Sequence, residues 1–354
     1  MDQLLKIMQE LPDEVDCAMV SSDVNRRYLT GVSSTDGVLV ITRSVAYLLV
    51  DFRYYEMAVS RAKGFDVILF KNLYDELEKL FCELNCCDIA IEIGDITVET
   101  FNKYQKRFKS INFIADGGLD ATISRLRMNK SAEEVEKIKS AQEVADAAFS
   151  HILSFISPGK TELEIARRLN SFILEKSDGL SFETIVVSGK NSSLPHGLPS
   201  SKQIQKGDFV TMDFGALIDG YHSDMTRTIC CGEPSNDQKK VYDLVLSGQK
   251  LALDAVRPGA MCCDIDDLVR KYFNGFGFDE EFGHGLGHGV GLSIHEKPSL
   301  SPKEPCKLSC GMVITVEPGL YLSGKYGVRI EDMVLVSEEG CENLTKSSKE
   351  LICI

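Results

Sequence analysis

Gly207-Asp-Phe-Val-Thr-Met-Asp213-Phe-Gly215 and Gly311-Met-Val-Ile-Thr-Val-Glu317-Pro-Gly319 are two stretches of the chain with one shared pattern. When Gly207 is aligned with Gly311, a carboxylate stands at the same position of each, within an apolar run that is typical of a buried strand. A buried carboxylate is paired, hydrogen-bonded or bound to a metal ion. Two strand-embedded carboxylates at matched positions favour a metal ion over two unrelated salt bridges.

The two stretches belong to a longer internal repeat. Each is preceded by a pair of predicted helices with a Pro-Gly step between them, Pro158-Gly159 in the first half and Pro258-Gly259 in the second. Ser131, Thr161 and Ser235 each have Glu or Gln three residues later, which is the capping box that begins a helix. We therefore predict an internally duplicated domain with a site on its pseudo-two-fold axis.

The strand that follows each stretch adds a second carboxylate, Asp224 in the first half and Glu331 in the second. Asp219-Gly220 is a strong signal for a two-residue hairpin turn. With that turn, Asp213 faces Thr226 and lies diagonally opposite Asp224 on one sheet face, about 7–8 Å apart at the α-carbons. This spacing allows both carboxylates to bind one metal ion.

A segment rich in glycine and histidine, Gly283-His284-Gly-Leu-Gly287-His288-Gly-Val-Gly291-Leu-Ser-Ile-His295-Glu296, lies between the hairpins. His284 and His288 have the spacing of a helical zinc pair, but the alternating glycines disfavour a helix. The alternation predicts an extended segment whose backbone another part of the chain approaches closely. A phosphate-binding loop is the alternative, but the Lys-Ser/Thr that such a loop requires does not follow.

One histidine and four carboxylates form a donor set for divalent ions such as Mn²⁺, Co²⁺, Zn²⁺ or Fe²⁺. Four carboxylates carry too much negative charge for one ion but suit two. Such a pair lowers the pKa of a shared water and polarises a carbonyl group. The donor set therefore predicts hydrolysis of an amide or an ester.

These residues resemble the pita-bread metallopeptidases, which include aminopeptidase P, prolidase and methionine aminopeptidase. The N-terminal region also looks like the creatinase-type domain of the proline-directed members, which methionine aminopeptidases lack. The stretches that carry the resemblance are Asn25-Arg-Arg-Tyr-Leu-Thr-Gly31, Ala46-Tyr-Leu-Leu-Val-Asp51-Phe-Arg-Tyr54, Leu194-Pro-His196-Gly, Met212-Asp213-Phe-Gly, Ser223-Asp224-Met-Thr-Arg-Thr228, Gly287-His288-Gly-Val-Gly291, His295-Glu296, Val316-Glu317-Pro-Gly319 and Val328-Arg329-Ile-Glu331-Asp332.

The resemblance implies a dinuclear metal site, with manganese the first choice and cobalt, zinc or iron the alternatives. It implies five metal ligands, of which Asp213 binds one ion, His288 and Glu317 bind the other, and Asp224 and Glu331 bridge both. Glu317 is also expected to take part in catalysis.

Four further residues receive roles from the same resemblance. His284 and His295 are expected to steady the substrate or the tetrahedral intermediate, and His196 to line the proline side of the site. Arg329 is expected to bind substrate or to orient the adjacent carboxylates through charge-assisted hydrogen bonds. For His196 and Arg329 a purely structural role is the alternative.

A length of 354 residues predicts two domains. We expect an α/β creatinase-like N-terminal domain at 1–122, a linker at 123–130 and an α+β pita-bread catalytic domain at 131–354. Residues 37–42 and 46–50 suit strands, and residues 53–62 and 73–84 suit helices. No histidine precedes His151, so the first domain is expected to serve packing or oligomerisation.

The composition limits the cellular locations and the binding partners that we expect for the protein. A formal net charge of −14 argues against nucleic-acid binding, and no apolar stretch reaches the length of a membrane helix. The N-terminus lacks the pattern of a secretory signal, and the twelve cysteines contain no C-x-x-C. We expect a cytoplasmic protein with reduced thiols, and the resemblance implies a homodimer that acts on proline-containing peptides.

Four functions remain open at this point. The first choice is an Xaa-Pro aminopeptidase that removes the residue before proline from a peptide N-terminus, and the alternative is an Xaa-Pro dipeptidase (prolidase). A non-enzymatic binding protein and a metal-free amidinohydrolase of the creatinase type share the fold. The complete set of metal-ligand residues argues against these last two.

Overall fold

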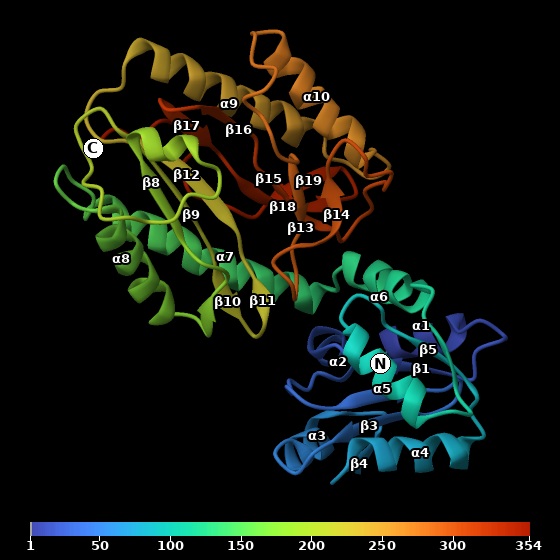
Figure 1. Cartoon of the computed structure of the whole chain (residues 1–354). Helices are drawn as coiled ribbons and strands as arrows, with labels where there is room; N and C mark the ends of the chain where they lie inside the picture. Colours follow the sequence, from blue (N-terminus) through green and yellow to red (C-terminus); the bar gives the residue numbers. More distant parts are fainter. Residues whose placement is uncertain (1) are drawn as a thin grey trace. The chain divides into compact units, whose positions relative to one another are not determined.

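The computed structural model describes residues 2–354, and the chain divides into two compact units, Met1–Arg127 and Met128–Ile354. The elements of the first unit are α1 (Asp2–Glu10), β1 (Cys17–Val20), α2 (Asp23–Thr30), β2 (Val38–Ile41), β3 (Ala46–Val50), α3 (Tyr55–Arg61), β4 (Asp66–Leu69), α4 (Leu73–Leu84), β5 (Asp88–Ile91), α5 (Val98–Arg107), β6 (Asn112–Ile114) and α6 (Gly118–Met128). The strands form one sheet in the order β4-β3-β2-β1-β5-β6, with the helices around it (Figure 1).

The first unit has an apolar core on each face of this sheet, because successive residues of a strand point to opposite faces. Cys17 of β1 packs in a core with Leu77 of α4, while Ala18 packs in the other core with Ile7 of α1. The predicted strands at 37–42 and 46–50 and the predicted helix at 73–84 are present.

The boundary between the units falls within the segment 123–130 that is predicted as a linker. Helix α6 continues to Met128, and Ile123 and Leu126 are buried in the core of the first unit. Apolar residues at helical spacing have a surface to pack against here, so the segment folds as a helix. The division between Arg127 and Met128 lies at the C-terminal end of this helix.

The second unit contains two helix pairs with strands between them, as Figure 1 shows. The helices are α7 (Ala132–Leu153), α8 (Glu162–Leu174), α9 (Asn236–Ala255) and α10 (Cys262–Asn274), with a short 3₁₀ helix, η1 (Gly189–Ser193). The strands are β7 (Gly179–Leu180), β8 (Ile185–Ser188), β9 (Phe209–Phe214), β10 (Ala216–Ile218), β11 (Tyr221–His222), β12 (Met225–Cys230), β13 (Gly287–Gly289), β14 (Glu296–Leu300), β15 (Val313–Val316), β16 (Gly319–Leu322), β17 (Tyr326–Arg329), β18 (Asp332–Ser337) and β19 (Gly340–Asn343).

Three of these four helices begin with the capping boxes that the sequence predicts. The side chains of Ser131, Thr161 and Ser235 each accept a hydrogen bond from the backbone three residues later, and the Glu or Gln there bonds back to the cap. Each box satisfies two backbone donors that a helix N-terminus would otherwise leave without a partner.

The predicted duplication is visible in the backbone hydrogen bonds of the two halves. Thr161 forms a β-bridge with Gln203 before α8, and Met261 forms the matching bridge with Lys307 before α10. The halves meet at their return strands, where the Glu331 N–H donates to the Thr226 carbonyl at 3.1 Å. Residues that stand 105 positions apart in the sequence are thereby brought together at the centre of the unit.

Two statements apply to the whole described chain. All twelve cysteines within residues 2–354 are free thiols. None of the described helices combines the length and the apolar character needed to cross a membrane.

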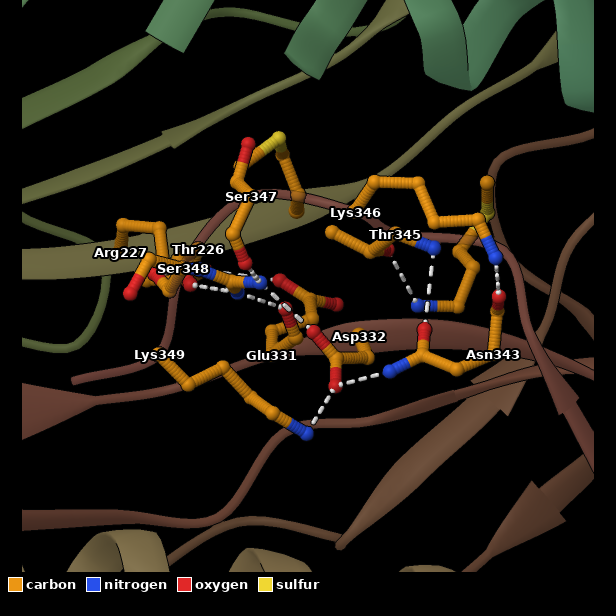
Figure 2. A network of polar contacts seen from close by, with 12 residues as sticks. Thr226, Arg227, Glu331, Asp332, Asn343, Thr345, Lys346, Ser347, Ser348 and Lys349 are labelled. Atoms are coloured by element: carbon orange, nitrogen blue, oxygen red, sulfur yellow. Dashed lines mark hydrogen bonds and ion pairs between the residues drawn. The ribbon is translucent and has the colours of Figure 1, made fainter. Parts of the chain in front are cut away.

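A buried ionic network joins β12, β18 and the C-terminal segment (Figure 2). A hydrogen bond from Gln249 extends this network to α9. Asp332 is fully buried, and its carboxylate accepts hydrogen bonds from Arg227 at 2.7 Å and from Lys349 at 2.6 Å. Gln249 and Asn343 also donate to it, at 2.9 and 2.8 Å. Burial raises the pKa of Asp332, but the charges of Arg227 and Lys349 outweigh burial, so the net pKa is lowered.

We expect Asp332→Asn to lower the free energy of unfolding by about 3–5 kcal/mol, because breaking one partner of a buried charge network leaves Arg227 uncompensated. Urea unfolding followed by circular dichroism measures this loss. Asp267→Asn removes an exposed ion pair with Lys271 on α10 and serves as the control, with an expected change of at most about 0.5 kcal/mol. Equal effects of the two substitutions would contradict the prediction.

Candidate metal centre

One cavity of about 290 Å³ in the second unit brings together all nine residues that the sequence predicts for the site. These residues come from both halves of the repeat, and the remaining lining is mostly apolar or glycine. The nine are His196, Asp213, Asp224, His284, His288, His295, Glu317, Arg329 and Glu331, and the others are Phe182, Ile185, Pro195, Gly285, Gly287 and Ile294.

The first hairpin has the predicted register. Asp213 pairs with Thr226, and the Asp219-Gly220 turn has positive φ at both residues, 46° and 75°. Positive φ at both positions is the conformation that twists a two-residue turn to match its strands. The turn therefore fixes which face of the sheet Asp213 and Asp224 share.

The glycine-rich segment is extended, as predicted, and passes very close to its neighbours. A Cβ atom on Gly287 would lie 2.1 Å from the Thr315 carbonyl oxygen, and one on Gly289 would lie 2.4 Å from the Lys297 carbonyl oxygen. Only glycine fits at these two positions, which flank His288 in β13. The segment thus holds His288 between strands β14 and β15.

Asp224, His288 and Glu331 each offer one ligand atom, and these three atoms lie within 4.8 Å of one another. The His288 Nε2 atom is 3.6 Å from Asp224 Oδ2 and 3.4 Å from Glu317 Oε1. Its Nδ1 atom lies 3.1 Å from the Gly289 carbonyl, which only accepts, so Nδ1 carries the proton. Burial lowers the pKa of His288 and so favours the neutral imidazole. Its Nε2 atom then directs a lone pair at carboxylate oxygens. A cation between these atoms would relieve their mutual repulsion.

Asp213 has one satisfied oxygen and one free oxygen. Its Oδ2 atom accepts a hydrogen bond from Arg329 at 2.7 Å, while Oδ1 is buried without a hydrogen-bond partner among the described residues. An unsatisfied buried acceptor is costly. The free oxygen is therefore a suitable metal donor.

The charge balance of the cavity also fits a divalent metal centre. Burial raises the pKa of Asp224 and of Glu331 well above the usual range, and neighbouring carboxylates add to the effect. Burial raises the pKa of Glu317 to about 8. Arg329 supplies one positive charge to a cavity lined by four carboxylates, and divalent ions would supply the rest.

Two threonines that support the carboxylates were not predicted as site residues. Thr226 donates to Glu331 at 2.7 Å, and Thr315 donates to Glu317 at 3.2 Å. The alternation of a strand offers a weak signal for Thr315, which stands two residues before Glu317 on the same face.

Tyr321 in β16 is a third residue that was not predicted for the site. Its hydroxyl oxygen lies 3.0 Å from His284 Nε2 and 2.8 Å from an Arg329 guanidinium nitrogen. Burial raises the pKa of Tyr321 to about 12 and lowers the pKa of His284 to about 4. Tyr321 therefore donates its proton to neutral His284 and accepts from Arg329.

The two other histidines, His196 and His295, also line the cavity. The His295 ring packs edge-on against His288, with ring centroids 4.4 Å apart. His196 follows Pro195, whose carbonyl accepts a hydrogen bond from Arg329 at 3.2 Å. Arg329 thus contacts both Asp213 and the segment that carries His196.

We expect Asp224→Asn to weaken metal binding without destabilising the metal-free protein, because the substitution removes both a ligand and a repelled buried charge. Adding Mn²⁺ to metal-stripped wild type at 100 times the dissociation constant should stabilise it by about 2.7 kcal/mol. Differential scanning fluorimetry should show a much smaller rise in Tm for the variant. In EDTA the variant should melt at or above the wild-type Tm. A rise in Tm on metal addition as large as that of wild type would refute the role of Asp224 as a metal ligand. Asp267→Asn is the control.

Comparison with known proteins identifies the family of the chain. The sequence model of metallopeptidase family M24 matches residues 136–338, and that of the creatinase/prolidase N-terminal domain matches residues 1–129. An Xaa-Pro dipeptidase from Pyrococcus furiosus is 37% identical over 356 residues, which cover 99% of each chain.

Solved structures agree over the whole chain. An Xaa-Pro dipeptidase from Bacillus anthracis has a TM-score of 0.96 at 39% identity and covers 100% of this chain and 99% of its own. An X-Pro aminopeptidase from Thermotoga maritima has a TM-score of 0.91 at 34% identity and covers 98% of this chain and 100% of its own. The predicted fold class, a creatinase-like α/β domain followed by a duplicated α+β pita-bread domain, is confirmed. The chain belongs to metallopeptidase family M24.

Proposed function

We propose that the protein is a metal-dependent Xaa-Pro dipeptidase, a prolidase, which hydrolyses the bond between the first residue and proline. The observation that carries this proposal is the single cavity in which the histidine and the four carboxylates of the donor set meet. A hydrolytic metal centre explains the raised pKa values of Asp224, Glu317 and Glu331. It also explains the free oxygen of Asp213.

The dipeptidase replaces the aminopeptidase as first choice, although the sequence motifs are shared by both. The Pyrococcus furiosus relative and the Bacillus anthracis structure are both Xaa-Pro dipeptidases. A cavity of about 290 Å³ is at the small end of ligand sites, which favours a dipeptide over a longer peptide. The similarity to the Thermotoga maritima X-Pro aminopeptidase makes that activity the second candidate.

The metal centre that we propose contains two divalent ions, with Mn²⁺ the first choice and Co²⁺, Zn²⁺ or Fe²⁺ the alternatives. Asp213 would hold one ion and His288 with Glu317 the other, while Asp224 and Glu331 would bridge both. Bound ions of this kind supply an activated water and polarise the scissile carbonyl.

The remaining residues of the cavity bind and orient the substrate in this proposal. The apolar side chains of Phe182, Ile185 and Ile294 exclude water and receive the proline ring. His295 contacts the peptide beside the metal centre. The Tyr321 hydroxyl holds Arg329 and His284 in one orientation, and Arg329 in turn holds Asp213.

We also propose that the protein is a cytoplasmic homodimer. The twelve free thiols support a reducing compartment, and the resemblance to family members supports the dimer. A net charge of −14 supports the absence of a nucleic-acid partner.

We expect metal-stripped protein to regain hydrolysis of Leu-Pro on addition of Mn²⁺ and to leave both Leu-Ala and Leu-Pro-Gly largely intact. Release of leucine, measured by chromatography, checks this result. Asp224→Ala should abolish the activity, because a metal ligand is lost. Cleavage of Leu-Pro-Gly at a similar rate would identify an aminopeptidase. Inactivity on Leu-Pro and on Leu-Pro-Gly with every divalent ion would refute the proposal.

We expect Tyr321→Phe to lower kcat/KM for Leu-Pro by about ten- to hundredfold, because Arg329 and His284 lose a shared hydrogen-bond partner. Steady-state kinetics measures this effect. Tyr326→Phe in the neighbouring strand β17 removes a hydroxyl outside the cavity and should leave kcat/KM within about twofold. Similar losses in the two variants would argue against a specific role for Tyr321.

A further inference from the structure

A carboxylate outside the cavity holds the segment that carries His196. Glu162, the first residue of α8, is fully buried and accepts hydrogen bonds at both carboxylate oxygens. The Ser188 backbone N–H and hydroxyl donate at 2.6 and 2.9 Å, and those of Ser200 donate at 3.1 and 2.6 Å. The Asn191 side-chain amide lies 3.2 and 3.3 Å from the two oxygens. Every one of these donors belongs to residues 188–200.

The internal repeat allows Glu162 to be compared with the equivalent residue of the second half. The Glu162 backbone N–H donates to the Lys202 carbonyl at 3.1 Å, and in the second half the Cys262 backbone N–H donates to the Cys306 carbonyl at 2.9 Å. Glu162 and Cys262 are therefore equivalent, and both are fully buried. The second half forms the same helix start without a carboxylate. The fold therefore does not require a buried charge here, although burying one is costly.

Two further hydrogen bonds hold the middle of residues 188–200 beside the cavity. The Pro195 carbonyl accepts a hydrogen bond from Arg329 at 3.2 Å. The Ser192 hydroxyl accepts one from the Gly327 N–H at 2.9 Å. His196 thus stands in a segment that is bonded to Glu162 at both ends and to β17 residues in the middle.

Apolar burial contributes little to the position of this segment. Leu194 and Leu198, which flank His196, are 56% and 62% exposed. Segments with few buried apolar contacts open locally at low free energy unless polar bonds hold them. The Glu162 carboxylate supplies such bonds.

We propose that Glu162 is a positioning residue, which places Pro195 and His196 at the substrate side of the cavity by bonding both ends of residues 188–200. This inference rests on the proposed function only for its kinetic consequence. The structural consequence, the ordering of the segment, is independent of the reaction.

Hydrogen exchange followed by mass spectrometry tests the ordering directly. Glu162→Gln keeps the side-chain shape but replaces one acceptor oxygen with an NH₂ group. This group is a donor, so it cannot accept the hydrogen bonds that Ser188 or Ser200 donates there. Exchange in residues 188–202 should become at least about tenfold faster, while α7 and α9 keep wild-type rates. Ser200→Ala, a milder change that removes one donor, should produce a smaller effect in the same peptides. Unchanged exchange in both variants would overturn the proposal.

Kinetics on Leu-Pro distinguishes positioning from general stability. Glu162→Gln should raise KM by about tenfold and change kcat by less than about twofold, with unchanged Mn²⁺ affinity. His196→Ala should do the same, and the double variant should be no worse than His196→Ala alone, because both act through one group.

Asp146→Asn is the matched control. Asp146 on α7 accepts hydrogen bonds from the backbone N–H groups of Lys346 and Ser347 and fixes a segment outside the cavity. This variant should lower Tm without raising KM. If Glu162→Gln lowers Tm in the same way and leaves KM unchanged, its role is structural only. Wild type that is inactive on Leu-Pro would refute the proposed function, and the hydrogen-exchange result would still decide the ordering role.

Discussion

Repulsion among buried carboxylates is the constraint on which the second unit depends. Asp213, Asp224, Glu317 and Glu331 line one cavity, and burial and mutual repulsion raise the pKa values of the last three. One guanidinium supplies positive charge, and two threonine hydroxyls donate hydrogen bonds to the carboxylates. Each of these groups is fixed by a strand, so the arrangement cannot relax by moving apart. Divalent cations bound at the same place, as we propose, would offset this energetic cost.

The duplicated architecture explains how so many charges reach one point. Each half contributes a hairpin with two carboxylates, and the return strands of the two halves meet at Thr226 and Glu331. The halves have since become different at their edges. The first half has a carboxylate at the start of α8 where the second half has a thiol at the start of α10. Symmetry therefore accounts for the four carboxylates of the cavity, while the residues at the starts of α8 and α10 show where the halves differ.

The parts of the structure that local chemistry determines were predictable from the sequence. The Asp219-Gly220 turn fixed the register of Asp213, and alternating glycines indicated an extended segment around His288. Tyr321 was not predictable, because its contacts with His284 and Arg329 arise from packing between distant strands. The helix that runs into the predicted linker at 123–130 was not predicted, because polar residues there concealed the helical spacing of Ile123 and Leu126. The choice between dipeptidase and aminopeptidase lay outside the shared motifs and needed full-length relatives.

The close approach of backbones around His288 has a consequence for the thermodynamics of metal binding. Because Gly287 and Gly289 lie against the carbonyls of Thr315 and Lys297, the strand between them has almost no alternative conformation. A metal-binding side chain that becomes ordered only when the ion binds loses conformational entropy, which reduces affinity. A side chain that is already ordered avoids this loss of entropy. The imidazole of His288 is already in a fixed orientation before an ion arrives. Metal affinity at this position should therefore depend mainly on the charge and desolvation of the carboxylates, with only a small loss of chain entropy.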